Sequence, residues 1–579
     1  MIPLFLPGPS GAIFVSLYPA QCSSLDNKWV LHLPAFAEEM NKSRKMVSSQ
    51  ARELSQRGVT VVIPDLYGTG DSAGDYRDAN WQAWRDDLGY LIQWIQSQGA
   101  ESITFWGLRL GCLLALDAVN EFKGQVKELM FWQPVQGGKQ YMTQFLRLRM
   151  AAGMFKGEQE TVGELREKSK GGETLEVAGY DISPRMLDHT EQLSLQDLVI
   201  PQDIKVTLFE VVSNKGKALS PVMRKAVESW AETGIEVDAS TVSGDPFWTT
   251  QEISMAPELL RRTTEALALQ SHSYTSLEHA DQGSTAEYIA DHGEKPFIFS
   301  CNKEELAGIL HKSDQPTARG VLLVVGGPQY RVGSHRQFVL LARDLAETGI
   351  PVFRFDYRGM GDSSGSLAGF DSINEDIGAA IDAFQSACPG VEEVVVWGLC
   401  DAATAAGFYA PNDSRVSGLV LLNPWVHSAE GAAKAVLKHY YFQRLFSKGL
   451  WSKILKGDFD ISKSLASLVA IVRGATGNRK TDAANQEKQA NSGSQSADLT
   501  ERLFRGLQKF QGKVLFILSG NDLTASEFED SVNASRRFRR LIKGNRFTIQ
   551  RLEEADHTFS RRIWRDAVSS LTGRWIQSL

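Results

Sequence analysis

A cysteine, an aspartate and a histidine occur in the second half of this 579-residue chain in an order that suits nucleophilic catalysis. Cys400 lies in the segment GLCDA at 398–402, which has the form of a G-x-S-x-G nucleophile elbow with cysteine in place of serine. Asp522 follows an apolar run, and His557 lies near the C-terminus. In this order the histidine takes the thiol proton or holds a thiolate–imidazolium pair, while the aspartate fixes its tautomer. The predicted chemistry is attack of the sulfur on an acyl carbon.

Taken alone, each of these residues has a simpler interpretation. Cys400 would be a buried structural thiol, and His557 would be an ordinary surface or core residue. Two features favour the catalytic interpretation. Gly398 and Ala402 are small, as a tight elbow requires, and the acid and the base follow in the expected chain order, each after a strand-like segment. We therefore predict a Cys–His–Asp triad.

This chemistry also requires an oxyanion hole. One donor should be the backbone N–H of Asp401, at the start of the helix that follows the elbow. The other should come from the loop GGPQ at 326–329, and because Pro328 has no N–H, we predict Gln329. Solvated surface charge is favoured over binding of a substrate carboxylate or phosphate for three basic residues that follow: Arg331, His335 and Arg336.

The candidate residues lie in the second copy of a long internal repeat. DLYGTGDSAG at 65–74 and DYRGMGDSSG at 356–365 are 291 positions apart, and so are WGLRLG, which begins at Trp106, and WGLCDA, which begins at Trp397. A repeat of this length indicates duplicated or fused domains rather than a solenoid. The repeated glycine-rich segment lacks the GK[ST] ending and the GxGxxG spacing, so we predict a structural turn rather than a phosphate site.

Strand and helix patterns alternate in the same order in both copies. Apolar, β-branched runs occur at 29–34, 59–65 and 101–107 in the first copy and at 320–325, 351–356 and 391–398 in the second. Helical spacing separates them at 46–56 and 81–96, and at 338–348 and 373–387. This alternation predicts parallel sheets covered on both faces by helices.

The later parts of the copies complete the predicted architecture. Each copy has a strand that ends at a proline, Pro134 or Pro424, then a helical insertion at about 135–200 or 425–510, then a strand that begins Lys-Val. The predicted fold class is α/β, with two tandem α/β-hydrolase domains, each a mostly parallel sheet flanked by helices with a helical cap insertion. We predict a first domain at 1–270, a linker at 271–294 and a second domain at 295–579.

The first copy has lost the triad. Arg109 stands at the position of the cysteine, and a guanidinium cannot act as a nucleophile. Alignment of the Lys-Val strands places Asn214 at the position of the aspartate, and alignment of GDPFW with ADHTFS places Asp245 at that of the histidine. We predict an inactive domain in which Arg109 and Asp245 form an ion pair. The alternative is that Arg109 binds an anionic ligand.

Composition limits the class of protein. Hydrophobic residues make up 42% and charged residues 23% of the chain, as in a soluble globular enzyme, and the net charge of -7 gives no reason to expect a nucleic-acid partner. No Lys or Arg precedes Lys28, so the basic start of a secretory signal is missing. The five cysteines form no CxxC pair, which argues against zinc ribbons and disulfide-linked modules. We expect a cytoplasmic, reduced protein with no metal and no cofactor.

Long motifs also resemble two known families. PAFAEEMNKSRKM at 34–46, DLYGTGDSAGD and WGLRLG resemble exosortase A system-associated hydrolase 2, while GGPQYRVGSHRQF at 326–338, FDYRGMGDSSG and WGLCDA resemble exosortase A system-associated hydrolase 1. Both are α/β-hydrolase superfamily proteins that usually occur as separate chains, so this chain resembles a fusion. The resemblance implies bacteria that make exopolysaccharide and sort PEP-CTERM proteins, and it implies no settled substrate. It also implies that arginine is the usual residue at this elbow position in the hydrolase 2 family.

The predicted function is hydrolysis of an ester, thioester or lactone through an acyl-cysteine intermediate, with a small-molecule acyl substrate. Cys, His and Asp on this fold are similar to the triad of dienelactone hydrolases. Two alternatives remain open: acyl transfer to a saccharide or lipid acceptor, and a non-catalytic scaffold or ligand-binding protein. The basic, aromatic segment at 434–456 is interpreted as a cap helix in preference to a segment that lies on a membrane or receives an acyl chain.

Overall fold

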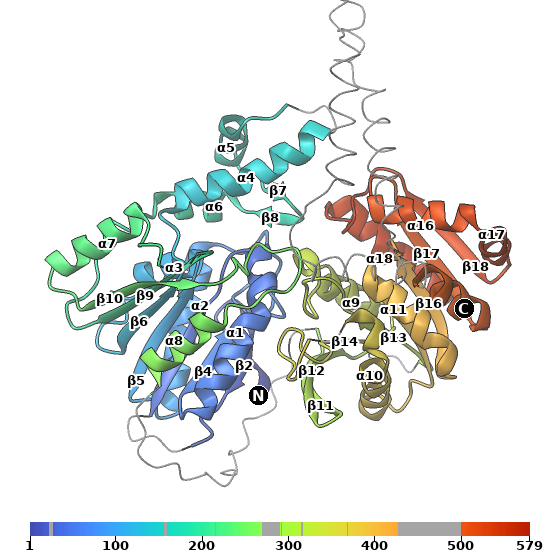
Figure 1. Ribbon diagram of the computed structural model, residues 1–579, viewed down its shortest axis with the longest axis horizontal. Helices are drawn as coiled ribbons and strands as arrows, with labels where there is room; N and C mark the ends of the chain where they lie inside the picture. Colours follow the sequence, from blue (N-terminus) through green and yellow to red (C-terminus); the bar gives the residue numbers. More distant parts are fainter. Residues whose placement is uncertain are drawn as a thin grey trace, which may run out of the picture. The chain divides into compact units, whose positions relative to one another are not determined.

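The computed structural model describes residues 1–22, 27–155, 159–214, 216–268, 290, 292–313, 317–367, 369–426 and 499–579 (Figure 1). By the density of its internal contacts the chain divides into two compact units. Unit 1 comprises Met1–Val394 and Ser560–Gly573, and unit 2 comprises Val395–Phe559 and Arg574–Leu579. Most of the linker predicted at 271–294 lies outside the described residues, and the domain boundary there stays a prediction.

The first sheet has eight strands in the order β1-β2-β4-β3-β5-β6-β9-β10. An antiparallel β1–β2 hairpin pairs with β4, and the other neighbours run parallel. The strands are β1 (Ile2–Gly8), β2 (Gly11–Tyr18), β3 (Lys28–Leu33), β4 (Thr60–Pro64), β5 (Ser102–Leu108), β6 (Val126–Trp132), β9 (Lys205–Val212) and β10 (Val237–Ser243). The predicted mostly parallel sheet is confirmed.

Helices cover both faces of this sheet because its strands are apolar on both sides. One hydrophobic cluster joins the strands to α1 (Glu38–Gln56) and α8 (Pro257–Leu267). A second cluster joins them to α2 (Trp81–Ser97), α3 (Leu110–Ala118) and α7 (Pro221–Glu232). The two faces alternate along each strand, so that Val30 belongs to the first cluster and Leu31 to the second.

The second sheet repeats this order as β11-β12-β14-β13-β15-β16-β17-β18. Its strands are β11 (Glu294–Cys301), β12 (Glu304–His311), β13 (Arg319–Val324), β14 (Val352–Phe355), β15 (Glu393–Leu399), β16 (Val416–Leu422), β17 (Lys513–Ser519) and β18 (Phe547–Leu552). Its described helices include α9 (Gln337–Glu347), α10 (Asn374–Ala387), α11 (Asp401–Tyr409), α16 (Leu523–Ala534), α17 (Arg536–Ile542) and α18 (Arg562–Gln577). Two α/β-hydrolase-like sheets therefore follow one another in the chain, as predicted.

The hairpins β1–β2 and β11–β12 were not predicted from the sequence. Pro3 and Pro7 in β1, and Pro296 in β11, interrupt the strand patterns. Proline is tolerated there because β1 and β11 are edge strands, where one side of the backbone needs no ladder partner.

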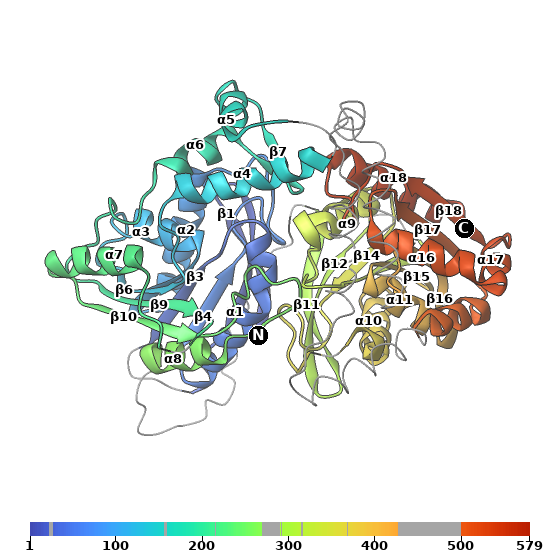
Figure 2. The same ribbon diagram turned by 45° about the horizontal axis from the view of Figure 1, so that its top comes forward.

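The insertion after β6 forms the predicted cap of the first repeat, with a small hairpin added. Figure 2 shows its elements grouped above the first sheet. They are α4 (Gly138–Phe155), α5 (Val162–Lys170), β7 (Leu175–Val177), β8 (Tyr180–Ile182) and α6 (Pro184–Gln192). Most of the corresponding second insertion, including the segment at 434–456, lies outside the described residues.

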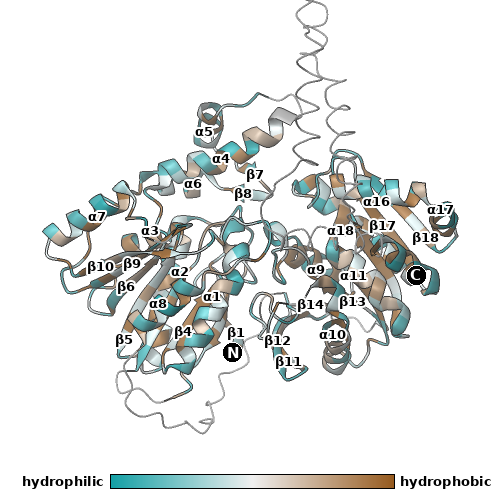
Figure 3. Cartoon of the chain, in the orientation of Figure 1, coloured by the Kyte–Doolittle hydropathy of each residue, from teal (hydrophilic) through white to brown (hydrophobic). Residues whose placement is uncertain are grey.

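The hydropathy of the chain follows this arrangement. Figure 3 shows apolar residues along the strands and polar residues on the outward sides of helices such as α5 and α7. Among the helices that the structure describes, none combines the length and the apolar character needed to cross a bilayer.

Candidate active site

The turn between β15 and α11 is a strained nucleophile elbow. Cys400 stands between the two elements with φ 62° and ψ −123°, a conformation that residues other than glycine rarely adopt. A Cβ atom on Gly398 would lie 2.7 Å from the carbonyl carbon and oxygen of Ala402, so no larger residue fits at 398. The backbone N–H of Cys400 donates to the carbonyl of Leu422 in β16, which fixes the turn at the carboxyl end of the strands.

Unit 2 brings the three predicted triad residues together. The Nδ1 atom of His557 lies 2.9 Å from Oδ2 of Asp522, and the ring of His557 is also a hydrogen-bond partner of the Cys400 thiol. Asp522 follows β17, and its carboxylate accepts the backbone N–H groups of Thr524 and Ala525 as the N-cap of α16. The acid is 7% exposed and the histidine side chain 36%, so the base is accessible while its partner is held in place.

The electrostatics of the pair favour protonated forms. Burial raises the pKa of the Cys400 thiol, against the lowering effect of His557. Burial lowers the pKa of His557, but the hydrogen bonds and charges of Asp522 and Cys400 outweigh it and raise that pKa to about 11. Because the two groups titrate together, the pair must lose one proton before a thiolate–imidazolium pair forms.

Asn423 supports the histidine loop, a role that sequence reasoning missed. Its side chain donates to the carbonyl oxygen of His557 and to Oγ of Ser519, both at 2.9 Å. Ser519 in turn donates to the carbonyl of Asp556 at 2.8 Å. Asn423 is fully buried with φ 43° at the end of β16. The one available signal was an asparagine before Pro424, since asparagine tolerates positive φ better than other residues.

The two predicted oxyanion donors lie in different units. Asp401 is the first residue of α11, directly after Cys400, so its backbone N–H stands at a helix N-terminus. Gln329 lies in unit 1, where its side chain accepts from Asn41 at 2.8 Å and donates to Glu38. The backbone N–H of Gln329 as second donor stays a prediction.

The prediction of surface charge after the 326–329 loop is wrong. Arg331 is 1% exposed, and His335 and Arg336 are each 4% exposed. Arg331 pairs with buried carboxylates, and Arg336 donates to four backbone carbonyls of the turn at 68–74. The charge of Arg331 is matched by Asp71 of the first repeat and by two aspartates of its own, and the donors of Arg336 are matched by carbonyls of the first repeat.

The first repeat keeps the elbow and has arginine in it. Arg109 has φ 56° and ψ −115°, close to the values at Cys400. Its guanidinium lies 3.2–3.3 Å from the carboxylate of Glu39. Tyr141 donates to the same carboxylate at 2.9 Å, and the ring of Trp248 lies 5.2 Å from the guanidinium carbon.

The predicted partner of Arg109 is therefore wrong. The carboxylate of Asp245 is exposed and accepts a hydrogen bond from Ser254, and Asn214 is also exposed. Glu39 takes the place of Asp245 because it stands at the start of α1, directly after β3, and β3 is the neighbour of the elbow strand β5. An anionic ligand at Arg109 would have to compete with a carboxylate that is already present.

Comparisons with known proteins agree with the fold. Residues 316–560 match the family model described as serine aminopeptidase, S33, a span that contains Cys400, Asp522 and His557. The fold is that of the α/β-hydrolases. Where that description names a serine enzyme, this chain has a cysteine at the elbow. A search of curated proteins found no match.

Similar solved structures include hydrolases from archaea and bacteria. An esterase from Pyrococcus furiosus is 13% identical with a TM-score of 0.33, over 49% of this chain and 90% of that one. A putative alpha/beta hydrolase from Agrobacterium tumefaciens is 15% identical with a TM-score of 0.31, over 49% and 95%. An acylaminoacyl peptidase from Pyrococcus horikoshii is 14% identical with a TM-score of 0.31, over 49% and 41%.

Proposed function

We propose that the second repeat hydrolyses an ester, thioester or lactone through an acyl-cysteine intermediate on Cys400. The observation that carries this proposal is the hydrogen-bonded series of Cys400, His557 and Asp522 at a strained elbow. A buried structural thiol needs no imidazole that is itself oriented by a carboxylate. The side chain of His557 is 36% exposed, which leaves the base accessible.

The reaction proceeds in two halves. His557 takes the proton of the Cys400 thiol as the sulfur attacks the acyl carbon, and Asp522 stabilises the imidazolium. The oxyanion accepts a hydrogen bond from the backbone N–H of Asp401. The intermediate expels an alcohol or thiol that takes the proton from His557. Water, deprotonated by His557, then attacks the thioester and releases the acid and the free thiol.

The biological setting rests on the resemblance to the exosortase A system-associated hydrolases. It supports a role in an exopolysaccharide-associated pathway, in the cytoplasm, on a small acyl substrate. The family match to residues 316–560 supports hydrolase chemistry more broadly.

A burst experiment with p-nitrophenyl acetate tests the proposal. We expect a rapid release of about one equivalent of p-nitrophenolate, followed by slower turnover, with mass spectrometry locating the acetyl group on Cys400. Cys400→Ala should abolish the burst. Cys388→Ala is the matched control, because Cys388 is another partly buried thiol whose pKa is raised by burial. A burst that survives in Cys400→Ala, or an adduct on another cysteine, contradicts the proposal.

The formation and breakdown of the acetyl-cysteine also test the two alternatives, acyl transfer and a non-catalytic scaffold. If the enzyme is an acyltransferase, a saccharide or amine acceptor will accelerate breakdown of the acetyl-cysteine and will itself become acetylated. If the protein is a scaffold, neither a burst nor turnover that depends on Cys400 will occur.

A further inference from the structure

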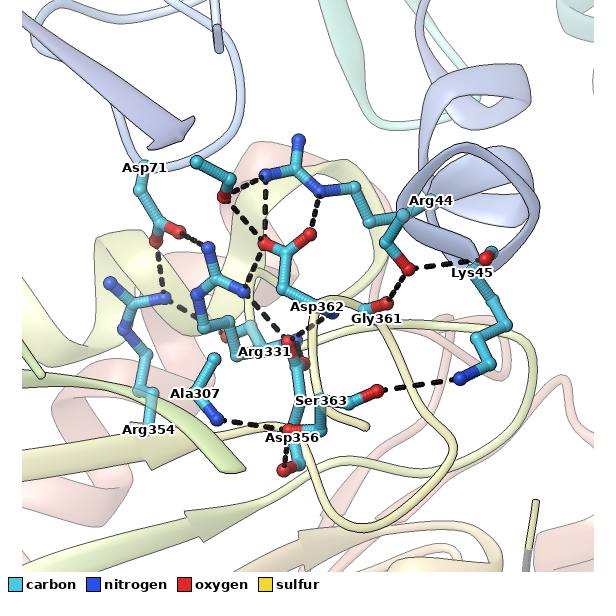
Figure 4. A network of polar contacts seen from close by, with 12 residues as sticks. Arg44, Lys45, Asp71, Ala307, Arg331, Arg354, Asp356, Gly361, Asp362 and Ser363 are labelled. Carbon is cyan, nitrogen blue, oxygen red and sulfur yellow. Dashed lines mark hydrogen bonds and ion pairs between the residues drawn. The ribbon is translucent and has the colours of Figure 1, made fainter. Parts of the chain in front are cut away.

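Unit 1 contains a buried network of charged side chains drawn from both repeats (Figure 4). Each of its arginines is at most 3% exposed and each of its aspartates at most 1%. Its members are Arg44, Asp65, Asp71, Arg331, Arg354, Asp356 and Asp362. Burying this many charges is costly unless each is paired with good geometry, so the network defines a specific arrangement.

The ion pairs of this network are reciprocal. Arg44 of the first repeat lies 2.8 Å from Asp65 of its own repeat and 2.7 Å from Asp362 of the other. Arg331 of the second repeat lies 2.7 Å from Asp356 of its own repeat and 2.8 Å from Asp71 of the other. Asp65 and Asp356 are 291 positions apart, and so are Asp71 and Asp362. Each arginine thus binds the first aspartate of its own turn and the second aspartate of the opposite turn.

A second contact also occurs twice, with both its donor and its acceptors shifted by 291 positions. Lys45 donates to the carbonyls of Ser363 and Gly365 at 3.3 and 3.4 Å. Arg336, which is 291 positions after Lys45, donates to the carbonyls of Ser72 and Gly74 at 2.6 and 2.9 Å. Ser72 and Ser363 are also 291 positions apart, and so are Gly74 and Gly365.

A third pair extends the pattern along the helices α1 and α9. Arg52 donates to the backbone carbonyl of Asp362. Arg343, again 291 positions later, donates to the carbonyl of Ser72 at 3.1 Å. An apolar contact accompanies these polar ones, because Met40 of α1 packs in one cluster with Tyr330, Val332 and Val339.

Reciprocity of this kind is the property of a two-fold interface, in which residue i contacts j and j contacts i. Two domains that merely met at the ends of a linker would have no reason to repeat the contacts of Lys45 with Ser363 and Gly365 at one offset in those of Arg336 with Ser72 and Gly74. Separation would leave Asp71 and Asp362 without the arginine of the other repeat, and unpaired buried carboxylates are strongly unfavourable. The surface that carries α1 and the turn at 65–74 is therefore built for one class of partner.

We propose that the two repeats form an internal dimer through this surface, and that the partner it fits is the second repeat, whether or not a peptide bond joins the two. The proposal does not depend on any catalytic role of Cys400. It predicts that the first repeat, without a triad, is retained as a docking partner for the second.

Cleavage between the repeats tests the proposal in the full chain. A recognition sequence for a specific protease is inserted in 271–289, and the folded protein is cut. We expect the two pieces to elute together with the mass of the uncut chain, and the amides of the turns at 65–74 and 356–365 to keep their slow hydrogen exchange. Pieces that elute separately, or turns whose exchange accelerates on cleavage, overturn the proposal.

Substitutions then test the network itself in the cut protein. Asp71→Asn removes the charge that Arg331 and Arg354 share, and loss of one partner of a buried pair should weaken association of the pieces by about a hundredfold or more. Asp376→Asn is the matched control, because Asp376 is also fully buried and its guanidinium partner, Arg358, belongs to its own repeat. Equal weakening by both substitutions overturns the proposal. Should Asp71→Asn fail to fold, Lys45→Ala, which removes two contacts to carbonyls of the partner repeat, replaces it and must weaken association more than Asp376→Asn.

Discussion

The elbows of the two repeats share a backbone and differ in what they hold. At Arg109 and Cys400 the φ angles are 56° and 62°, and each backbone N–H donates to the end of the next strand, at 3.0 and 2.9 Å. Glycine precedes both by two residues because a Cβ atom there would lie within 3 Å of the following helix. The strained turn has persisted where no nucleophile uses it. Strand-end packing therefore maintains the elbow, and the surrounding side chains decide whether it does chemistry.

Those surroundings differ in burial and in charge. In the second repeat a 7% exposed aspartate holds the histidine. In the first repeat Asn214 and Asp245, at the matching positions, are exposed, and Glu39 accepts hydrogen bonds from the guanidinium and from Tyr141. The first repeat thus has an ion pair between Arg109 and Glu39 where the second repeat has a thiol and an imidazole. Substitutions at matched positions of the two repeats test this difference.

The largest expected effect is that of His557→Gln. Without a base the Cys400 thiol keeps its proton, so we expect kcat/KM for p-nitrophenyl acetate to fall by about 10³-fold or more. His189→Gln is the control, because His189 also lies near a carboxylate, 4.0 Å from Asp117, in the repeat without a nucleophile. Comparable losses in both variants would show that the effect is one of folding rather than catalysis.

Asp522→Asn should have the next largest effect, on kcat. Asparagine caps helices about as well as aspartate, so the N-cap bonds to Thr524 and Ala525 are kept and only the charge beside His557 is lost. We expect a loss of about 10²–10⁴-fold with little change in the melting temperature. A variant that is fully active, or one that loses activity in proportion to its stability, contradicts a catalytic role for Asp522.

The pH dependence of kcat/KM should show whether Cys400 and His557 are both protonated at neutral pH. Burial raises the pKa of Cys400, and Asp522 and Cys400 raise that of His557 to about 11, so the doubly protonated pair persists at neutral pH. We expect kcat/KM to rise from neutral into alkaline pH, and the rise to move to lower pH in Asp522→Asn. The raised pKa of His557 also stabilises the fold below pH 6.5, and this stabilisation is lost as the pH rises through about 11. A flat wild-type profile between pH 6 and 9 would contradict the assignment.

The sequence predicts the local parts of this comparison and misses the non-local ones. The elbow, the alternation of strands and helices, and the chain order of Asp522 and His557 follow from short segments and from the 291-residue repeat. The pairing of Arg109 with Glu39 does not, because it depends on which strand ends adjoin β5. Arg331 and Arg336 were expected at the surface because one carboxylate partner of Arg331, Asp71, and the carbonyls that accept from Arg336 lie more than 250 positions away in the chain.

A buried carboxylate offers a further contrast between the repeats. Asp376 accepts the backbone N–H and the guanidinium of Arg358 at 2.9–3.0 Å. Tyr67 stands 291 positions before Arg358, and Asp87 accepts its backbone N–H at 2.7 Å with no guanidinium. One oxygen of Asp87 has no hydrogen-bond partner among the described residues, and burial raises the pKa of Asp87 to about 7.

Asp87→Asn should therefore stabilise the first repeat in a pH-dependent way. A carboxyl whose pKa is raised in the folded state destabilises the fold progressively as the pH rises from about 4 to 7. Relative to wild type we expect no gain at pH 4 and a gain on the order of 2 kcal/mol at pH 8. Thermal unfolding at both pH values measures the difference. Asp376→Asn should instead destabilise at pH 8, because it leaves Arg358 without its buried partner, and a gain in both variants would refute the contrast.

The smallest expected effect is that of restoring a nucleophile to the first elbow. Arg109→Cys places a thiol on a backbone that already has the elbow conformation. No histidine stands at the matching position, and the exposed Asp245 cannot take the role of an imidazole base. In a chain that also carries Cys400→Ala, we expect no burst and no acetyl group on residue 109. A burst in that double variant would mean that backbone strain suffices to activate a thiol on this fold, and the distinction between the two repeats would then depend on the identity of one side chain.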